Sequence, residues 1–122
     1  MAKTILLVDD STTMLMSLRH TLELAQYKVE TAPDGQDAFQ RIQSGFKPDL
    51  VITDINMPKM NGIDFIRNAR SVLRFTPILA LTTESESKKR DEAKQLGATG
   101  WLVKPVPGPE LIKVVKHLLP GS

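Results

Sequence analysis

Two adjacent carboxylates, Asp9 and Asp10, directly follow an apolar run that is rich in β-branched residues. Such a run is typical of a strand that is covered on both faces, as in a parallel sheet. Side-by-side aspartates repel each other at neutral pH, which costs free energy unless a positive charge lies nearby. A third carboxylate, Asp54, and an ammonium group, Lys104, also follow apolar runs directly. The sequence therefore predicts an acidic cluster with a compensating cation.

The residue types in this set point to phosphoryl chemistry. Thr82 and Thr83 follow another apolar run and add a hydroxyl donor. Clustered carboxylates suit Mg²⁺, which takes oxygen ligands, keeps several waters and often completes its shell with phosphate oxygens. A carboxylate nucleophile, a cation, a hydroxyl and an ammonium group are what formation of an aspartyl phosphate requires.

The elements that must position these groups alternate along the chain. The apolar runs predicted as strands are residues 4–8, 28–32, 50–53, 78–81 and 101–103. Segments with helical spacing follow each run, and the fourth, at about 84–96, has only Ala93 and Leu96 as apolar anchors. The alternation indicates a doubly wound α/β fold, with a five-stranded parallel sheet flanked by five helices. All strands then have their carboxyl ends at one edge, where ligands bind in such sheets.

Local signals predict some helix boundaries. Asp34 is expected to cap the second helix and Gly45 to end it. Pro109 suits the first position of the last helix. Asp10 or Ser11 is expected to cap the first helix.

The paired aspartates have a second interpretation as nothing more than the capping region of a helix. Asp favours that position because its charge is stabilised by the helix dipole. The presence of Asp54 and Lys104 at the same predicted edge favours a functional site instead.

Length and composition narrow the class of protein. The 122 residues fit one domain, residues 1–122, and the lack of cysteine excludes a disulfide scaffold and thiol chemistry. The N-terminal apolar run is too short for a signal peptide or a membrane span, so we expect a cytoplasmic protein without membrane insertion. A net charge of +2 is too small for a nucleic-acid-binding surface. We expect a monomer that acts through other proteins.

Four segments, VDDS, DINMPKMNG, LTTE and GATGWLVKP, resemble in order and spacing the receiver domain of bacterial response regulators. The resemblance covers essentially the whole chain and is nearest to the single-domain, CheY-like chemotaxis regulators. It implies a flavodoxin-like sheet with strand order 2-1-3-4-5. It also implies a signalling domain that catalyses its own phosphorylation and dephosphorylation, not an enzyme acting on other substrates.

The resemblance implies a role for each site residue. The phosphoacceptor is Asp54. The groups that surround Mg²⁺ are Asp9, Asp10, Asp54 and the backbone carbonyl of Asn56. The groups that bind the phosphoryl oxygens are Thr82, the backbone N–H of Thr83 and Lys104.

Two more pairs and one peptide bond are implied by the same resemblance. The switch pair is Thr82 and Trp101, and the pair that tunes dephosphorylation is Asn56 and Glu84. The bond between Lys104 and Pro105 is expected to be cis. The chain departs from the family at Val106, where Phe is usual, and at Trp101, where Tyr or Phe is more common. Trp101 therefore has a second interpretation as a packing residue.

The implied partners are a sensor histidine kinase, as phosphodonor, and a downstream protein such as a flagellar motor switch protein. A phosphate sink or a relay shuttle fits the same residues. An aspartyl-phosphate hydrolase is a rival from another class, but it needs Asp-x-Asp where this chain has Asp54-Ile55-Asn56. An interaction module without phosphorylation is a third possibility, which the complete acidic cluster disfavours.

Overall fold

The computed structural model describes residues 2–83 and 87–120, in which strands and helices alternate. The strands are β1 (Thr4–Val8), β2 (Lys28–Ala32), β3 (Leu50–Asp54), β4 (Ile78–Thr82) and β5 (Gly100–Val103). The helices are α1 (Thr12–Leu24), α2 (Gly35–Gln43), α3 (Gly62–Val72), α4 (Ser87–Gln95) and α5 (Gly108–Leu118). Every strand pair is parallel and the order is β2-β1-β3-β4-β5, which confirms the expected fold.

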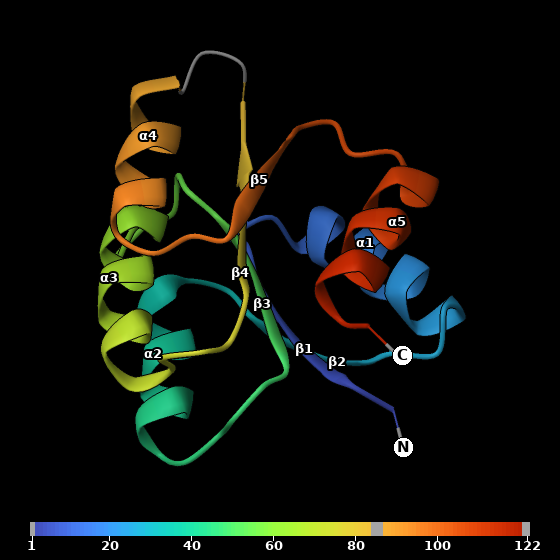
Figure 1. Cartoon of the computed structure of the whole chain (residues 1–122), viewed down its shortest axis with the longest axis horizontal. Helices are drawn as coiled ribbons and strands as arrows, with labels where there is room; N and C mark the ends of the chain where they lie inside the picture. The colour runs from blue at the N-terminus through green and yellow to red at the C-terminus, as the bar shows by residue number, and fades with distance from the viewer. Residues whose placement is uncertain (1, 84–86, 121–122) are drawn as a thin grey trace.

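Helices cover both faces of the sheet (Figure 1): α2, α3 and α4 pack on one face, and α1 and α5 pack on the other. Successive residues of β1 contribute to opposite clusters, since Leu6 packs toward α3 and Leu7 toward α1 and α5. The central strands β3 and β4 are buried along their whole length. This double coverage explains why they read as continuous apolar runs and not as alternating ones.

Three strands are one residue longer than their apolar runs predict. Strand β3 extends through Asp54 and β4 through Thr82, while β5 begins at Gly100. Backbone pairing continues past the apolar residues, because Asp54 is in register with Leu81 and Thr82 with Val103. Asp54 and Thr82 are thus the last residues of rigid strands and not part of the loops that follow.

The helix boundaries follow the predicted caps with one difference. The Ser11 side chain accepts a backbone N–H of the first turn of α1 at 3.2 Å, and Asp34 does the same for α2 at 2.8 Å. Gly45 has a φ of 107° just beyond α2, which is the left-handed conformation expected at a helix end. Helix α5 begins at Gly108, so Pro109 occupies its second position and not its first.

Helix α4 packs loosely, as its sequence predicts. Of its described side chains only Ala93 is buried, and Leu96, just beyond it, is half-buried. The first residues of the predicted helix, 84–86, lie outside the described residues. No helix within the described ranges is long and apolar enough to cross a membrane.

The connection from β3 to α3 folds back tightly on the end of β3. A Cβ on Gly62, the first residue of α3, would lie 2.2 Å from the Asp54 carbonyl oxygen and 2.6 Å from the Ile55 Cα. The Gly62 N–H also donates to the Ile55 carbonyl at 2.7 Å. A side chain at position 62 therefore has no room. The tight connection also holds the backbone of Asp54 in place.

We expect Gly62→Ala to lower the free energy of unfolding by about 3 kcal/mol, because backbone atoms must move to admit the methyl group. Gly108→Ala is a matched control, since Gly108 also begins a helix but a Cβ there would lie 3.4 Å from the nearest atom. The control should change stability by less than about 0.5 kcal/mol. Urea unfolding measures both, and equal losses would contradict the close approach at Gly62.

Candidate functional site: an acidic cluster at the carboxyl edge of the sheet

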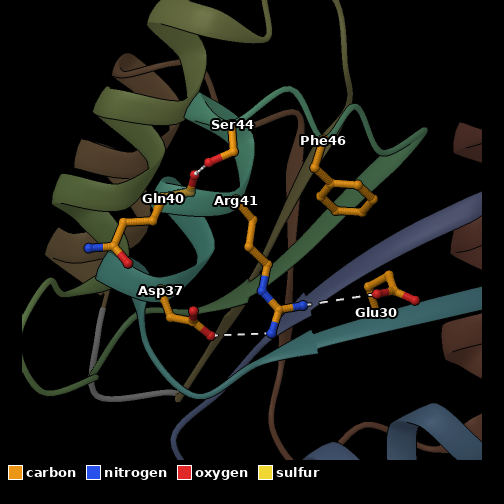
Figure 2. A pocket seen from close by; sticks show the side chains of 6 residues that line it. All are labelled: Glu30, Asp37, Gln40, Arg41, Ser44 and Phe46. Atoms are coloured by element: carbon orange, nitrogen blue, oxygen red, sulfur yellow. Dashed lines mark hydrogen bonds and ion pairs between the residues drawn. The ribbon is translucent and has the colours of Figure 1, made fainter.

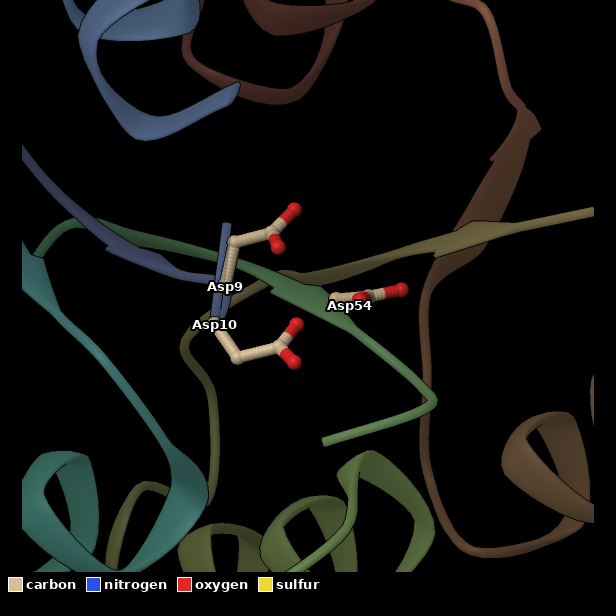
Figure 3. A group of neighbouring side chains, drawn as sticks. All are labelled: Asp9, Asp10 and Asp54. Atoms are coloured by element: carbon tan, nitrogen blue, oxygen red, sulfur yellow. The ribbon is translucent and has the colours of Figure 1, made fainter. Parts of the chain in front are cut away.

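Three carboxylates converge where two neighbouring strands end. Asp9 and Asp10 follow β1 and Asp54 ends β3, and β1 and β3 are paired. One oxygen from each of the three carboxylates lies within 4.8 Å of the others, and Figure 3 shows the three side chains directed to the same side. Asp9 is fully buried and Asp54 is buried, whereas Asp10 is exposed. The sequence prediction of a carboxylate cluster is therefore correct.

Lys104 supplies the positive charge that this cluster needs. Its Nζ lies 3.1 Å from the Asp9 Oδ2 and 3.2 Å from the Asp54 Oδ1. The backbone places it, because the Lys104 N–H donates to the Thr82 carbonyl at 2.7 Å. The Lys104–Pro105 bond is cis, as expected. One ammonium group thus faces two buried carboxylates at once.

A single ammonium group does not fully compensate these buried charges. Burial raises the pKa of Asp54, Lys104 opposes the rise, and the nearby Asp9 adds to it, so the pKa stays above its ordinary value. Burial alone would lower the pKa of Lys104, but Asp54 and Asp9 outweigh it and raise that pKa. The site therefore holds excess negative charge and would gain from a further cation.

Backbone N–H groups fix the orientation of two carboxylates. The Ser11 N–H donates to the Asp9 Oδ1 at 2.9 Å, and the Ile55 N–H donates to the Asp54 Oδ1 at 2.8 Å. The Asp54 Oδ1 also faces Lys104. The Asp54 Oδ2 has no hydrogen-bond or ion-pair partner among the described residues. One oxygen of Asp54 is held in place, and the other is available to a ligand.

Thr82 brings a buried hydroxyl to the same edge. It is fully buried at the end of β4, and its Oγ1 makes no hydrogen bond to the described part of the chain. A buried hydroxyl left unpaired costs free energy, so such groups normally have a ligand or water. The Thr83 side chain follows on the exposed surface. The Thr82 hydroxyl is therefore a candidate donor for a ligand at this edge of the sheet.

The cluster fits Mg²⁺ by the chemistry of its donors. Carboxylate oxygens from Asp9, Asp10 and Asp54 are the hard ligands that this ion prefers, and two of them are buried. Asn56, whose backbone carbonyl is the fourth expected ligand, is exposed two residues after Asp54. Glu84, the other residue expected to tune dephosphorylation, lies outside the described residues.

A contact that the sequence did not predict joins α4 to this site. The Lys89 Nζ donates to the Asn56 Oδ1. Lys89 sits in a charged segment that is typical of a solvated helix face, so only the position of α4 reveals the contact. The Asn56 side chain is therefore held by a cation from the helix that packs most loosely.

Trp101, the expected switch aromatic, faces outward. It lies on β5 opposite Ala80, two residues before the end of β4, and its side chain is 39% exposed. The Arg90 guanidinium lies over the indole ring, 5.8 Å from the centroid. Trp101 and Arg90 thus form a contact between α4 and β5 on the outer surface.

A groove of about 420 Å³ between α2 and β2 is not the chemical site. Figure 2 shows Arg41 in it, extended between Asp37 at 3.4 Å and Glu30 at 4.0 Å. Its charged groups thus pair with one another, and the ring of Phe46 lines one wall. None of the predicted site residues lines this groove. Its volume alone therefore does not make it a candidate functional site in place of the acidic cluster.

Comparisons with known proteins agree with this arrangement. Residues 5–116 match the family model of the response regulator receiver domain. The chemotaxis protein CheY1 of Helicobacter pylori is 36% identical over 121 residues, which cover 97% of this chain and 97% of the relative. A high-resolution structure of the chemotaxis response regulator CheY4 of Vibrio cholerae has a TM-score of 0.89 and 43% identity, and covers 97% of this chain and 99% of that one.

Longer relatives carry a similar segment. The alkaline phosphatase synthesis transcriptional regulatory protein PhoP of Bacillus subtilis is 35% identical over 122 residues, which are 100% of this chain but 50% of the relative. The chain spans about half the length of the transcriptional regulators that it matches. The shared segment is the one that contains the acidic cluster.

Proposed function

The chain belongs to the response regulator receiver domain family, and on that basis we propose that residues 1–122 form one receiver domain, phosphorylated on Asp54 by a sensor histidine kinase. Receiver domains are the signalling components of two-component systems, in which a phosphoryl group moves from a kinase histidine to the receiver. The observation that carries the proposal for this chain is the buried carboxylate of Asp54 beside Lys104, at the same edge of the sheet as the Thr82 hydroxyl, which has no partner among the described residues.

The residues support the following phosphotransfer. The Asp54 Oδ2 attacks the phosphorus, the bond from phosphorus to the histidine nitrogen breaks, and an acyl phosphate forms. Lys104 and the Thr82 hydroxyl stabilise the charge on the phosphoryl oxygens, together with the backbone N–H of Thr83. Lys104 is already in place because Asp9 and Asp54 hold its ammonium group.

We propose Asp9, Asp10, Asp54 and the Asn56 backbone carbonyl as the groups that hold Mg²⁺. The ion, when bound, would neutralise the carboxylates and the phosphoryl oxygens. The buried Asp9 anchors Lys104 at the same time. Hydrolysis then needs only a water that attacks phosphorus, which restores the Asp54 carboxylate and releases inorganic phosphate.

One assay separates this function from its rivals: incubation with acetyl phosphate and Mg²⁺. The proposal expects one phosphoryl group per chain, formed and then lost over seconds to minutes. Rapid multiple turnover without an accumulated adduct would indicate an aspartyl-phosphate hydrolase. The absence of both adduct and turnover would indicate an interaction module and contradict the proposal.

We propose a chemotaxis role, in which the phosphorylated domain binds a flagellar motor switch protein. The proposal is supported by CheY1 of Helicobacter pylori and CheY4 of Vibrio cholerae, which match this chain over nearly their full lengths. A phosphate sink or a relay shuttle remains the alternative. Binding of the phosphorylated domain to a motor switch protein separates them, since neither alternative requires that contact.

We expect the partner to present acidic residues, and its affinity to fall as the salt concentration rises. The exposed or half-exposed cations on α4 and α5 are Lys88, Lys89, Arg90, Lys94, Lys113 and Lys116. Equilibrium binding at 50 mM and 300 mM salt tests this. An affinity that does not change with ionic strength would argue against an electrostatic role for these residues.

We expect Asn56→Leu to lengthen the phosphoryl lifetime on the order of tenfold, because an apolar side chain there hinders the attacking water. A bulky apolar residue at Glu84 should act in the same direction. Gln43→Leu, on the exposed surface of α2, serves as the control and should leave the lifetime unchanged. Decay of the purified phosphorylated protein measures it, and a lifetime of hours in the unmodified chain would contradict the chemotaxis-type assignment.

A further inference from the structure

Arg70, on α3, bonds to two connections that are far apart in the sequence. Its Nη1 donates to the carbonyls of Leu73 at 2.8 Å, Arg74 at 3.1 Å and Thr76 at 2.8 Å. Its Nη2 donates to the carbonyl of Gly97 at 2.7 Å. The first three carbonyls belong to the connection from α3 to β4, and the fourth follows α4. One guanidinium group thus joins the carboxyl-terminal ends of two helices.

This cation has no acidic partner among the described residues, because all of its hydrogen bonds there go to backbone carbonyls. Carbonyls at helix ends carry partial negative charge, which a guanidinium group compensates. Burial lowers the pKa of Arg70. Within the described part of the chain, Arg70 neither contacts the acidic cluster nor forms an ion pair. Its role is therefore to hold together the two connections that it joins.

The backbone conformation of Gly97 and its lack of a side chain allow this contact. Its φ is 114°, a conformation that side chains rarely adopt. A Cβ on Gly97 would lie 2.9 Å from the Arg70 Nε and 3.1 Å from its Cγ. The close approach of Arg70 and the backbone turn therefore both require a glycine at this position.

The loop of residues 97–99, to which Arg70 bonds, ends α4 and leads into β5. The Ala98 N–H donates to the Ala93 carbonyl at 2.9 Å, which closes the end of α4. The Thr99 N–H donates to the Ile78 carbonyl at 2.7 Å, and the Thr99 Oγ1 accepts the Ile78 N–H at 3.0 Å, which starts β5 beside β4. Residues 97–99 consequently set the position of α4 relative to β5.

Helix α4 has few other contacts: Ala93 is its one buried side chain among those described, and Lys89 donates to the Asn56 side chain. The contact between Arg90 and Trp101 crosses from α4 to β5. Its geometry depends on how these two elements sit, so it depends on the loop that Arg70 fixes.

We propose that Arg70 is a positioning residue that anchors the carboxyl-terminal end of α4 and so keeps the Trp101 surface coupled to the rest of the domain. The coupling to Asp54 rests on the proposed function; the anchoring does not. The groups that take up the phosphoryl group do not need this anchor, because Asp54 and Thr82 end central strands and Lys104 is held by two carboxylates. Loss of Arg70 should therefore separate reception of the signal from its readout.

The first test uses Arg70→Lys in the metal-free protein, with Arg74→Lys as the matched control. Lysine keeps the charge but cannot reach carbonyls on both connections at once. Arg74 is exposed and only its backbone carbonyl contacts Arg70. We expect amide hydrogen exchange in residues 93–99 to rise roughly tenfold in Arg70→Lys, and Trp101 fluorescence to become more accessible to acrylamide. The control should match the unmodified chain in both measurements.

The second test asks whether Arg70 does more than stabilise the fold. Beryllofluoride mimics a bound phosphoryl group, and we expect it to change Trp101 fluorescence in the unmodified chain. In Arg70→Lys the rate of phosphorylation should stay within about twofold of the unmodified chain, while this fluorescence change falls by more than about half. Gly97→Ala, which displaces the guanidinium from the other side, should reproduce this pattern. If amide hydrogen exchange and acrylamide quenching of Trp101 in Arg70→Lys equalled those in Arg74→Lys, the proposal that Arg70 anchors α4 would be wrong. Parallel loss of phosphorylation and of the Trp101 response would overturn the separation of readout from reception. If the unmodified chain took up no phosphoryl group, the proposed function would fail, and the metal-free measurements would still decide the anchor.

Discussion

Asp54→Asn will abolish phosphorylation by acetyl phosphate, with labelling at least on the order of 10³-fold slower, because an amide oxygen is a poor nucleophile in place of the carboxylate. Asn keeps the shape of the side chain, so the fold should remain intact. Asp64→Asn serves as the control, since Asp64 is a carboxylate on α3 that pairs with Arg67 at 3.2 Å, apart from the cluster. Intact-protein mass spectrometry measures the labelling. Full labelling of Asp54→Asn would remove the basis for assigning Asp54.

The same substitution should raise stability at neutral pH when no metal is present. Because burial and Asp9 hold the pKa of Asp54 above its ordinary value, against the opposing effect of Lys104, ionised Asp54 costs folding free energy. That cost is absent below the unfolded-state pKa of 3.8 and is complete above the folded-state pKa. The gain in stability from Asp54→Asn should therefore be present at pH 7. It should vanish as the pH falls below the pKa of the Asp54 carboxyl in the unfolded chain. Denaturant unfolding at both pH values measures it, and a loss of stability at pH 7 would contradict the excess of negative charge.

Lys104→Met should lower the rate of phosphorylation by roughly 10²- to 10³-fold, the usual cost of removing one group that stabilises transition-state charge. Without metal it should also lower the free energy of unfolding by about 3 kcal/mol, because Asp9 and Asp54 would remain buried without their shared cation. Mg²⁺ should restore part of that stability by supplying positive charge to the same carboxylates.

Lys104→Arg is the matched comparison for this substitution. It keeps the charge and should lose less stability, while its rigid planar fork should still impair phosphorylation. Urea unfolding with and without Mg²⁺ measures both variants. A metal-free Lys104→Met as stable as the unmodified chain would show that Lys104 does not compensate the cluster.

The convergence of Asp9, Asp10, Asp54 and Lys104 could be predicted from the sequence because it depends on the backbone alone. Parallel strands place all their carboxyl ends at one edge, so a residue that directly follows an apolar run must lie there. The order that makes β1 and β3 neighbours came from the resemblance to the receiver family and not from the pattern of residues. Its confirmation by the strand pairing places the three carboxylates within reach of one ion.

The contacts of Lys89 and Arg70 could not be predicted in this way. Both lie on helices, where a small change in rotation or position redirects a long side chain, and both are of a residue type that usually faces solvent. Gly97 carried a signal, since a glycine after a helix predicts its end. The sequence did not indicate that the same glycine makes room for Arg70. The side-chain partners of loosely packed elements thus require the three-dimensional structure.

Peptide mapping of the chain after incubation with acetyl phosphate and Mg²⁺ is the strictest test of Asp54 as the phosphoacceptor. We expect a single phosphoryl group, located on the peptide that contains Asp54 and absent when Mg²⁺ is removed by a chelator. A phosphoryl group on any other residue, or equal labelling of Asp54 with and without Mg²⁺, would contradict the acidic cluster as a magnesium-dependent phosphoacceptor site.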